Sequence, residues 1–304
     1  MKVVILDKIS KEGIEMMKKE GIEVDVKTDF PKDKIKEIID DYEGVVVRSK
    51  TKLRREVLKD TKNLKFIIRA GVGLDNIDLE TAKERGIEVF NTPKASSIAV
   101  AELTLGFLIA LSRFIPQATF SLKEGKWEKE KFKGVELFGK TLGILGLGRI
   151  GKEVAKRAKA FGMRILAYDP QVSSSEFAEM VDFETLIRNS DYITLHLPLI
   201  PETKNLINKE VIGRMKDGVF IVNCARGGII DEKALCEALR SQKVRGAGFD
   251  VFEKEPPENK ELLELENFIC TPHIGASTIE AQEKISKEVA KVVIELQKKY
   301  EGSL

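Results

Sequence analysis

Short runs of β-branched residues alternate with charged, helix-forming segments along almost the whole chain, and this alternation most limits the folds it can adopt. The first series contains VVILD, EVDVKT, GVVVRS, KFIIRA and EVFNT. A second series, from Gly139 onward, contains TLGILG, RILAYD, DYITLHL, GVFIVNCA, VRGAGFDVF and NFICTPHI. Strands that alternate with helices form parallel sheets covered by helices on both faces. The sequence therefore predicts an α/β protein with two parallel-sheet domains.

Two helical segments indicate how these series divide into domains. The stretch SSIAVAELTLGFLIALSRFI predicts a buried helix between the series, and Ile279 to Tyr300 predicts one amphipathic helix, which could pack back on the first series. The predicted domains are residues 1–96 plus 277–304, a discontinuous substrate-binding domain, and residues 97–276, a nucleotide-binding domain. We expect a cleft between them.

Composition argues against several classes of partner. The chain is 42% hydrophobic and 33% charged, as in ordinary globular proteins. Its 51 Lys and Arg nearly balance its 49 Asp and Glu, so we expect no broad positive surface for nucleic acid. Glu102 interrupts the apolar helical stretch too early for a membrane span, and the N-terminus MKVVILDK lacks a signal-peptide pattern.

The cysteines Cys224, Cys236 and Cys270 are odd in number and lack CxxC spacing, which predicts reduced thiols and a cytoplasmic location. Cys224 has no paired base, so we interpret it as a small buried hydrophobic residue rather than a nucleophile. No group of His, Cys, Asp or Glu has the spacing of metal ligands, and no metal site is predicted.

Three glycines lie between a strand and a helix in GILGLGRIGKEVAKRAKAFGMRILAYDP. Gly146 would permit a tight turn, Gly148 would let the backbone approach a pyrophosphate, and Gly151 would let the helix pack on the strand. The helix, predicted from Arg149 to Phe161 with Gly162 as its C-cap, would direct its free N–H groups at the phosphates. The alternative is that the glycines merely turn a strand into a helix.

Asp169 ends the strand that follows this helix. Its carboxylate could accept both hydroxyls of a ribose and would repel a 2′-phosphate, which favours NAD over NADP. Alternatively, Asp169 only caps a turn before Pro170.

Arg226 follows FIVNCA, Glu255 follows GAGFDVFEK and His273 follows FICTP, so all three come just after strands, where parallel sheets bind ligands. Histidine suits proton transfer near neutral pH, and a carboxylate such as Glu255 could fix its tautomer. The planar guanidinium of Arg226 suits a carboxylate. A structural histidine and a structural ion pair are the alternatives. His196 also ends a strand, and either the adenosine half of a cofactor or plain packing would explain it.

Several motifs resemble those of the D-isomer-specific 2-hydroxyacid dehydrogenases: GLGRIG with Asp169, NCARGGIIDE, GAGFDVFEKEPP and TPHIGAST. RAGVGLDNID, KEGKWEKEKFKGVEL and ASTIEAQ are most similar to the branch that oxidises 3-phosphoglycerate. The resemblance implies a flavodoxin-like substrate domain, a Rossmann NAD-binding domain and a homodimer joined through the second domain. Some longer relatives have a C-terminal domain that binds serine; this sequence stops at Leu304, and we expect that regulation to be absent.

The same resemblance implies roles for individual residues. It makes Arg226 the clamp on the substrate carboxylate and carbonyl, His273 the acid–base and Glu255 its partner. The implied NAD contacts are Val72, Gly146, Gly148, Arg149, Ile150, Gly151, Asp169, Leu197, Pro198, Cys224, Ala225, Arg226, Asp250, His273, Gly275 and Ala276. The implied substrate contacts are Arg48, Arg69, Ala70, Gly71, Val72, Gly73 and Lys129.

Arg48 and Arg69 both follow strands, and together they suit a phosphate, although either alone could be a solvated charge. By resemblance, the RAGVG backbone would bind the substrate carboxylate. Lys129 would reach the phosphate in a neighbouring subunit or pair with nearby glutamates. Many relatives have Gly-Asn-Ser or Gly-Asn-Thr after the NTP turn, but this chain reads NTPKASS, which leaves open whether Ser96 replaces the usual Asn contact.

The leading prediction is NAD-dependent oxidation of 3-phosphoglycerate to 3-phosphohydroxypyruvate, the entry into serine synthesis. A reductase for hydroxypyruvate, glyoxylate or another 2-keto acid would use the same residues and is the first alternative. The second is a binding protein that senses NAD on this fold, which the joint presence of Arg226, Glu255 and His273 disfavours.

Overall fold

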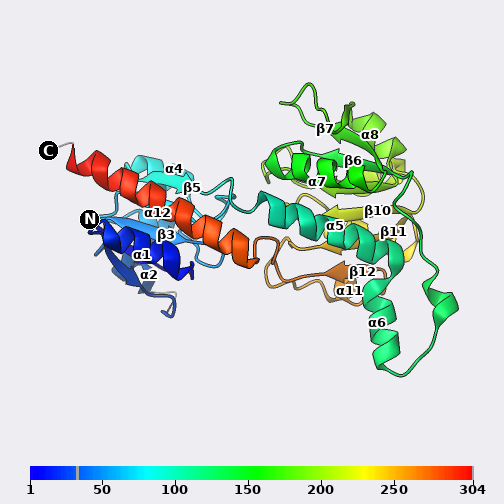
Figure 1. Ribbon diagram of the computed structural model, residues 1–304, viewed down its shortest axis with the longest axis horizontal. Helices are drawn as coiled ribbons and strands as arrows, with labels where there is room; N and C mark the ends of the chain where they lie inside the picture. Colours follow the sequence, from blue (N-terminus) through cyan, green and yellow to red (C-terminus); the bar gives the residue numbers. More distant parts are fainter. Residues whose placement is uncertain (32–33, 303–304) are drawn as a thin grey trace. The chain divides into compact units, whose positions relative to one another are not determined.

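The computed structural model describes residues 1–31 and 34–302. The chain forms two compact units (Figure 1). Unit 1 consists of Met1–Ser96 and Ala276–Leu304, and unit 2 consists of Ser97–Gly275. Each unit has its own sheet and its own hydrophobic core.

The sheet of unit 1 is entirely parallel and has the strand order β2-β1-β3-β4-β5. Its strands are β1 (Lys2–Ile5), β2 (Glu23–Val26), β3 (Gly44–Val47), β4 (Phe66–Arg69) and β5 (Glu88–Asn91). This is the order of flavodoxin-like sheets, in which the direction of winding changes between β1 and β3. Ligands of such sheets bind beyond the carboxyl ends of these two strands.

Helices cover both faces of this sheet. They are α1 (Lys11–Lys19), α2 (Ile35–Ile39), α3 (Arg55–Leu58), α4 (Leu79–Glu84) and α12 (Ile279–Glu301). Side chains of β1 alternate between the faces: Val3 and Ile5 pack with buried residues of α12, whereas Val4 packs with those of α2. In Figure 1, α12 runs beside α1, and Lys287 forms an ion pair with Glu12 at 3.1 Å.

The sheet of unit 2 is also entirely parallel, with the order β12-β11-β10-β9-β6-β7-β8. Its strands are β6 (Thr141–Leu145), β7 (Arg164–Tyr168), β8 (Glu179–Met180), β9 (Tyr192–Leu195), β10 (Val219–Asn223), β11 (Val244–Phe249) and β12 (Phe268–Cys270). The winding changes direction between β6 and β9, so a ligand is expected beyond these two strands. Two all-parallel sheets with interleaved helices confirm the predicted α/β fold class.

The helices of unit 2 are α5 (Ser97–Arg113), α6 (Ile115–Lys123), α7 (Arg149–Ala160), α8 (Phe183–Asn189), α9 (Lys209–Arg214), α10 (Glu232–Arg240) and α11 (Lys260–Leu263), with a short 3₁₀ helix η2 (Lys129–Phe132). The apolar stretch expected to form one helix is divided at Phe114, which has a left-handed backbone with φ of 54°. Pro116 then lies in the first turn of α6, where its missing N–H costs no hydrogen bond.

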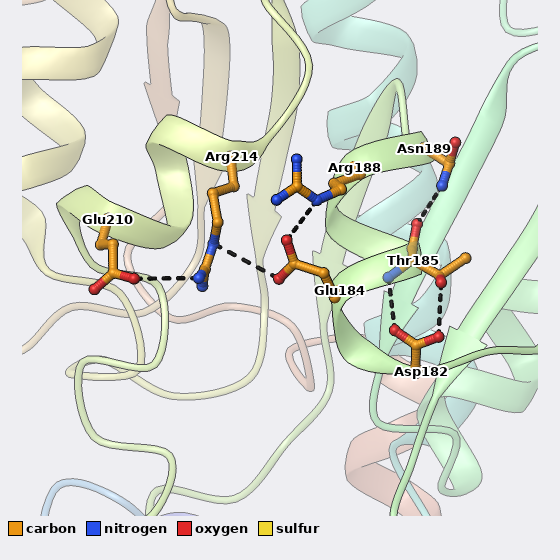
Figure 2. Close-up of polar contacts among 7 residues, drawn as sticks. All are labelled: Asp182, Glu184, Thr185, Arg188, Asn189, Glu210 and Arg214. Atoms are coloured by element: carbon orange, nitrogen blue, oxygen red, sulfur yellow. Dashed lines mark hydrogen bonds and ion pairs between the residues drawn. The ribbon is translucent and has the colours of Figure 1, made fainter.

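Polar contacts connect α8 to α9 on the surface of unit 2, as Figure 2 shows. Asp182 caps α8 by accepting hydrogen bonds from the Thr185 amide at 2.8 Å and its hydroxyl at 2.6 Å. Glu184 pairs with Arg188 in its own helix and, at 3.6 Å, with Arg214 of α9. Such exposed ion pairs contribute little individually, about 0–1 kcal/mol.

Within the described residues, no single helix is long and apolar enough to cross a membrane; by length and composition, only α5 and α6 taken together, bent by 62°, would qualify.

Candidate active site

The glycine loop of unit 2 joins β6 to α7 and is shaped by close backbone contacts. Gly146 has φ of 92°, and a Cβ there would lie 2.7 Å from the carbonyl oxygen of His196. A Cβ at Gly151 would lie 2.2 Å from the carbonyl oxygen of Gly146, so a side chain would push α7 away from the loop. The structure thus requires glycine at both positions for reasons of backbone packing.

Gly148 differs, because a Cβ there would meet no protein atom within 4 Å. The fold itself therefore does not require glycine at Gly148, and the space beside it is open for a pyrophosphate. Gly148 is also the N-cap of α7 and provides no side-chain cap, so the N–H groups at Arg149 and Ile150 begin the helix without a side-chain acceptor. This arrangement fits the phosphates of a dinucleotide.

Asp169 lies at the end of β7, beside the glycine loop. Its Oδ2 accepts a hydrogen bond from the Leu147 amide at 2.8 Å, and its Oδ1 accepts one from the Gln171 amide at 2.8 Å. The carboxylate therefore caps the turn after β7 and is also fixed next to the loop. Each oxygen retains a lone pair that can accept a ribose hydroxyl, so the two roles considered for Asp169 are compatible.

His196 follows β9, and its amide donates to the Leu145 carbonyl at 2.7 Å. Its Nε2 lies 3.1 Å from the Thr194 hydroxyl, and its Nδ1 has no hydrogen-bond partner among the described residues. Burial lowers the pKa of His196 to about 3, so its ring stays neutral near pH 7. The backbone carbonyl of His196 and the side chain of Leu197 both lie close to Gly146, so this segment forms part of the wall of the glycine loop, whereas the neutral imidazole is not suited to donate a proton.

His273 and Glu255 form the acid–base pair of unit 2. The Nδ1 atom of His273 lies 3.0 Å from Oε1 and 2.9 Å from Oε2 of Glu255. Because a carboxylate accepts hydrogen bonds, Nδ1 carries the hydrogen and Nε2 is left to accept a proton. Burial alone would raise the pKa of Glu255, but the hydrogen bond and charge of His273 outweigh it and lower that pKa from its usual value.

A buried carboxylate, Asp250, fixes the loop on which His273 lies. Its Oδ1 accepts from the Thr271 hydroxyl at 2.6 Å and the Ile274 amide at 2.7 Å, and its Oδ2 accepts from the Gly275 amide at 2.7 Å. His273 adopts a left-handed backbone with φ of 54°, which a non-glycine residue keeps only when its surroundings enforce it. The three hydrogen bonds to Asp250 supply that restraint.

Arg226 follows β10 in a loop that is fixed by another buried side chain, Asn223. The Asn223 side-chain oxygen accepts from the Ala225 amide at 3.0 Å, and its amide nitrogen donates to the Arg226 carbonyl at 2.9 Å. Arg226 Nη1 donates to the Ala225 carbonyl at 2.6 Å, and the arginine's positive charge also lowers the pKa of Glu255. Arg226, Glu255 and His273 therefore form one electrostatic group.

In unit 1, the predicted substrate contacts lie at the ends of the adjacent strands β3 and β4: Arg48 directly follows β3, and Arg69 is the last residue of β4. The guanidinium of Arg69 folds over its own loop, because a Cβ at Gly71 would lie 1.4 Å from Arg69 Nη1. Gly71 also has φ of 146°, so glycine is required there both for the backbone and for the position of the arginine.

Not every N–H group of the Arg69–Gly73 loop is available to a ligand. The amide of Ala70 donates to the Val47 carbonyl and that of Gly71 to the Arg69 carbonyl. The amides of Val72 and Gly73 donate to no group in the described part of the chain. Asn91 steadies the loop by donating to the Val72 carbonyl at 2.6 Å. Of the five residues predicted to bind a carboxylate, Val72 and Gly73 thus have open donors.

The remaining predicted residues lie in varied surroundings. Lys129 is exposed on η2 in unit 2, and no glutamate in the described ranges pairs with it, which leaves the ion-pair alternative without support. Ser96 is buried at the end of the first segment of unit 1.

Burial raises the pKa of Cys224 to about 12 despite a hydrogen bond from Thr104, so the interpretation of Cys224 as a buried, unreactive thiol agrees with its environment.

Sequence reasoning did not find Asn223 or Asn91, and it listed Asp250 only as a cofactor contact. Asparagine and aspartate within a loop have no spacing that reveals which backbone groups they bond. The only sequence signal for them was position: Asn223 lies at the end of one apolar run, and Asp250 directly follows another.

Comparisons with known proteins place this geometry in a family. The model of the D-isomer specific 2-hydroxyacid dehydrogenase NAD binding domain matches residues 105–275. A D-3-phosphoglycerate dehydrogenase of Methanocaldococcus jannaschii is 52% identical over 298 residues, which are 96% of this chain and 57% of that protein. A hydroxypyruvate reductase of Thermotoga maritima is 52% identical over 297 residues, 96% of this chain and 97% of that protein.

Solved structures agree. D-lactate dehydrogenase from Aquifex aeolicus, complexed with NAD and lactic acid, superposes with a TM-score of 0.86 at 31% identity, covering 99% of this chain and 96% of the other. This chain belongs to the D-isomer-specific 2-hydroxyacid dehydrogenase family, and the cofactor of its nucleotide-binding domain is NAD. It spans little more than half of the archaeal relative, 57%, but 97% of the Thermotoga one.

Proposed function

We propose that this protein oxidises a D-2-hydroxy acid with NAD, and that its substrate is 3-phosphoglycerate, which becomes 3-phosphohydroxypyruvate. The observation on which the proposal rests is the His273–Glu255 pair at 2.9 Å beside Arg226, in a chain whose nucleotide-binding domain takes NAD. An acid–base residue with a fixed tautomer is needed to remove a hydroxyl proton, whereas a protein that only senses NAD needs none.

The reaction divides between residues with distinct tasks. His273 Nε2 accepts the proton of the substrate hydroxyl, and the charged Glu255 stabilises the imidazolium that forms. Arg226 binds the substrate carboxylate and the carbonyl that develops at the α-carbon. The glycine loop and Asp169 would hold NAD, which would supply the acceptor for the hydride of the α-carbon. The Glu255 hydrogen bond keeps Nε2 ready to receive the proton.

Unit 1 supplies the proposed selectivity for a phosphorylated substrate. Arg48 and Arg69 would bind the phosphate, because guanidinium groups match its geometry, and the open amides of Val72 and Gly73 would bind the carboxylate. The name of the archaeal relative supports this substrate. Oxidation of 3-phosphoglycerate would place the protein at the entry into serine biosynthesis.

A second candidate is reduction of hydroxypyruvate or a related 2-keto acid. The Thermotoga relative of that name is as similar as the archaeal one, and this chain covers nearly all of it. The same catalytic group and cofactor loop would serve both reactions, so the difference lies in how unit 1 binds the third carbon of the substrate. A cytoplasmic location stays a prediction from the cysteine pattern.

Initial rates of NADH formation separate the candidates. The assay would compare 3-phospho-D-glycerate with D-glycerate, D-lactate and glyoxylate, the last followed as NADH consumption. The proposal expects kcat/KM for 3-phosphoglycerate to exceed that for D-glycerate by at least about tenfold, or 1.4 kcal/mol. Equal values would favour the reductase, and no turnover with bound NAD would favour the sensor.

A further inference from the structure

The change in winding of the unit 1 sheet brings two charged residues to adjacent strand ends. Asp7 comes shortly after β1 and Arg48 directly after β3, and these strands pair in register, with Ile5 opposite Val46. Ligands of parallel sheets bind beyond the carboxyl ends of such strands. The pair therefore lies where the topology of unit 1 predicts a ligand.

Asp7 is buried, with 6% of its surface exposed, and holds the loop after β3. Its Oδ2 accepts from the amide of Arg48 at 2.6 Å and from that of Thr51 at 3.2 Å. Its Oδ1 accepts from the Thr51 hydroxyl at 2.9 Å. A single carboxylate thus satisfies both ends of the Arg48–Thr51 segment.

Asn76 holds the same segment through its carbonyl groups. Its side-chain nitrogen donates to the Arg48 carbonyl at 2.7 Å and to the Thr51 carbonyl at 2.6 Å. Amides bonded by Asp7 and carbonyls bonded by Asn76 fix the peptide planes on both sides of Arg48. The backbone from which the arginine side chain extends is consequently set by buried residues that do not themselves belong to its loop.

Hydrogen bonds hold the backbone of Arg48, but in the described part of the chain they do not hold its side chain. It is half-buried, and within residues 1–31 and 34–302 no partner forms an ion pair or a hydrogen bond with its guanidinium. Burial lowers the pKa of Arg48, and the charge of Asp7 partly opposes this effect. A half-buried guanidinium that lacks a protein acceptor in these ranges is suited to an anionic ligand.

We infer that Asp7 is a positioning residue for substrate binding: by fixing the Arg48–Thr51 segment it directs the Arg48 guanidinium toward the phosphate of the substrate. The inference rests on the proposed function, which assigns that phosphate to Arg48. Asp7 itself would not touch the substrate. Its negative charge would weaken phosphate binding, so the benefit of Asp7 comes from its hydrogen bonds.

The negative charge of Asp7 and its hydrogen bonds have opposite effects on phosphate binding, so the direction of the change in KM distinguishes between them. Asp7→Ala removes the carboxylate and all three hydrogen bonds, and we expect it to raise KM for 3-phosphoglycerate about tenfold while kcat changes less than about threefold. Loss of the negative charge alone would lower KM. Asp7→Asn can still accept both amides with its oxygen and donate to the Thr51 hydroxyl, so its KM should stay within about threefold of the wild-type value.

A double-mutant cycle with Arg48→Ala tests whether Asp7 acts through the arginine. Arg48→Ala should raise KM, and adding Asp7→Ala to it should raise KM by less than about twofold further. Asp78→Ala is the matched control, because Asp78 caps α4 through the Thr81 amide at 2.9 Å and does not bond the Arg48 segment. It should lower the melting temperature but leave KM unchanged.

Four results would overturn the inference. An unchanged or lowered KM in folded Asp7→Ala, or full additivity with Arg48→Ala, would show that Asp7 only stabilises the fold. An unchanged KM in Arg48→Ala would refute the phosphate contact itself, and with it the role of Asp7. If Asp7→Ala does not fold, two substitutions at Thr51 replace it. Thr51→Val removes the hydroxyl hydrogen bond to Asp7 and should raise KM, whereas Thr51→Ser keeps that bond and should not. Any other outcome would refute the inference.

Discussion

His273 offers the simplest test of the proposed mechanism, because the whole proton transfer is assigned to its side chain. Replacement by Gln keeps approximate size but cannot exchange a proton. We expect His273→Gln to lower kcat by about two to four orders of magnitude. NADH binding, measured by fluorescence titration, should be nearly unchanged. A decrease in kcat of less than tenfold would remove His273 from the mechanism.

The pairing with Glu255 predicts a change in the pH dependence of oxidation. Burial opposes the effect, but the hydrogen bond and charge of His273 lower the pKa of Glu255, so its carboxylate is charged in the neutral range and stabilises the protonated imidazole. Oxidation requires a neutral imidazole, and its rate therefore falls as pH decreases. In Glu255→Gln that stabilisation is lost, so the acidic limb of the kcat/KM profile should move to lower pH. A limb that stayed in place, or moved to higher pH, would contradict the pairing.

At the scale of elements, the loop between β6 and α7 distinguishes glycines that the fold needs from one that the ligand needs. A methyl at Gly151 would meet the Gly146 carbonyl, whereas one at Gly148 would meet no protein atom within 4 Å. Gly151→Ala should therefore lower the melting temperature of the free protein. Gly148→Ala should leave it unchanged but raise the Kd for NAD at least about tenfold, because the methyl occupies the space beside the pyrophosphate.

Gly213 in α9 provides the control for these two substitutions. It is exposed and its Cβ position is open, so Gly213→Ala should stabilise the helix slightly, by about 0.4–1 kcal/mol, and should not affect NAD binding. Calorimetric melting and isothermal titration would measure both quantities. Equal loss of stability in Gly148→Ala and Gly151→Ala would refute the distinction.

The elements also show which features the sequence could predict. Strand runs such as GVVVRS and the glycine spacing have local patterns, and from them the α/β class and the cofactor loop follow. The break at Phe114 and the two-residue strand β8 lack such a pattern, since one left-handed residue and two strand residues change no periodicity. Contacts such as Asp7 with Arg48, separated by 41 residues, depend on strand order, which the sequence does not display.

At the scale of the whole molecule, the segment from Ile115 to Phe138 carries several large apolar side chains that are exposed to solvent. Phe120 is 65% exposed, Trp127 82% and Phe138 74%. Exposed apolar side chains grouped in one segment indicate a protein interface, and we propose that a second copy of the chain covers them, as the predicted homodimer requires.

Light scattering on variants would measure this association. Phe120→Glu combined with Trp127→Glu should convert a species with the mass of two chains into a monomer. Ile279→Glu, at a site 78% exposed in unit 1, should leave the mass unchanged. A wild-type protein with the mass of one chain at micromolar concentration would contradict the homodimer.

We propose that unit 1 selects a phosphorylated 2-hydroxy acid. The most direct measurement is the ratio of kcat/KM for 3-phosphoglycerate to that for D-glycerate, in the wild type and in Arg69→Ala. We predict that Arg69→Ala raises KM for 3-phosphoglycerate by at least about tenfold, or roughly 1.4 kcal/mol, and leaves D-glycerate nearly unaffected, so that the ratio collapses. Equal losses on both substrates would mean that Arg69 maintains the fold or binds the carboxylate, and the phosphate-specific function would be refuted.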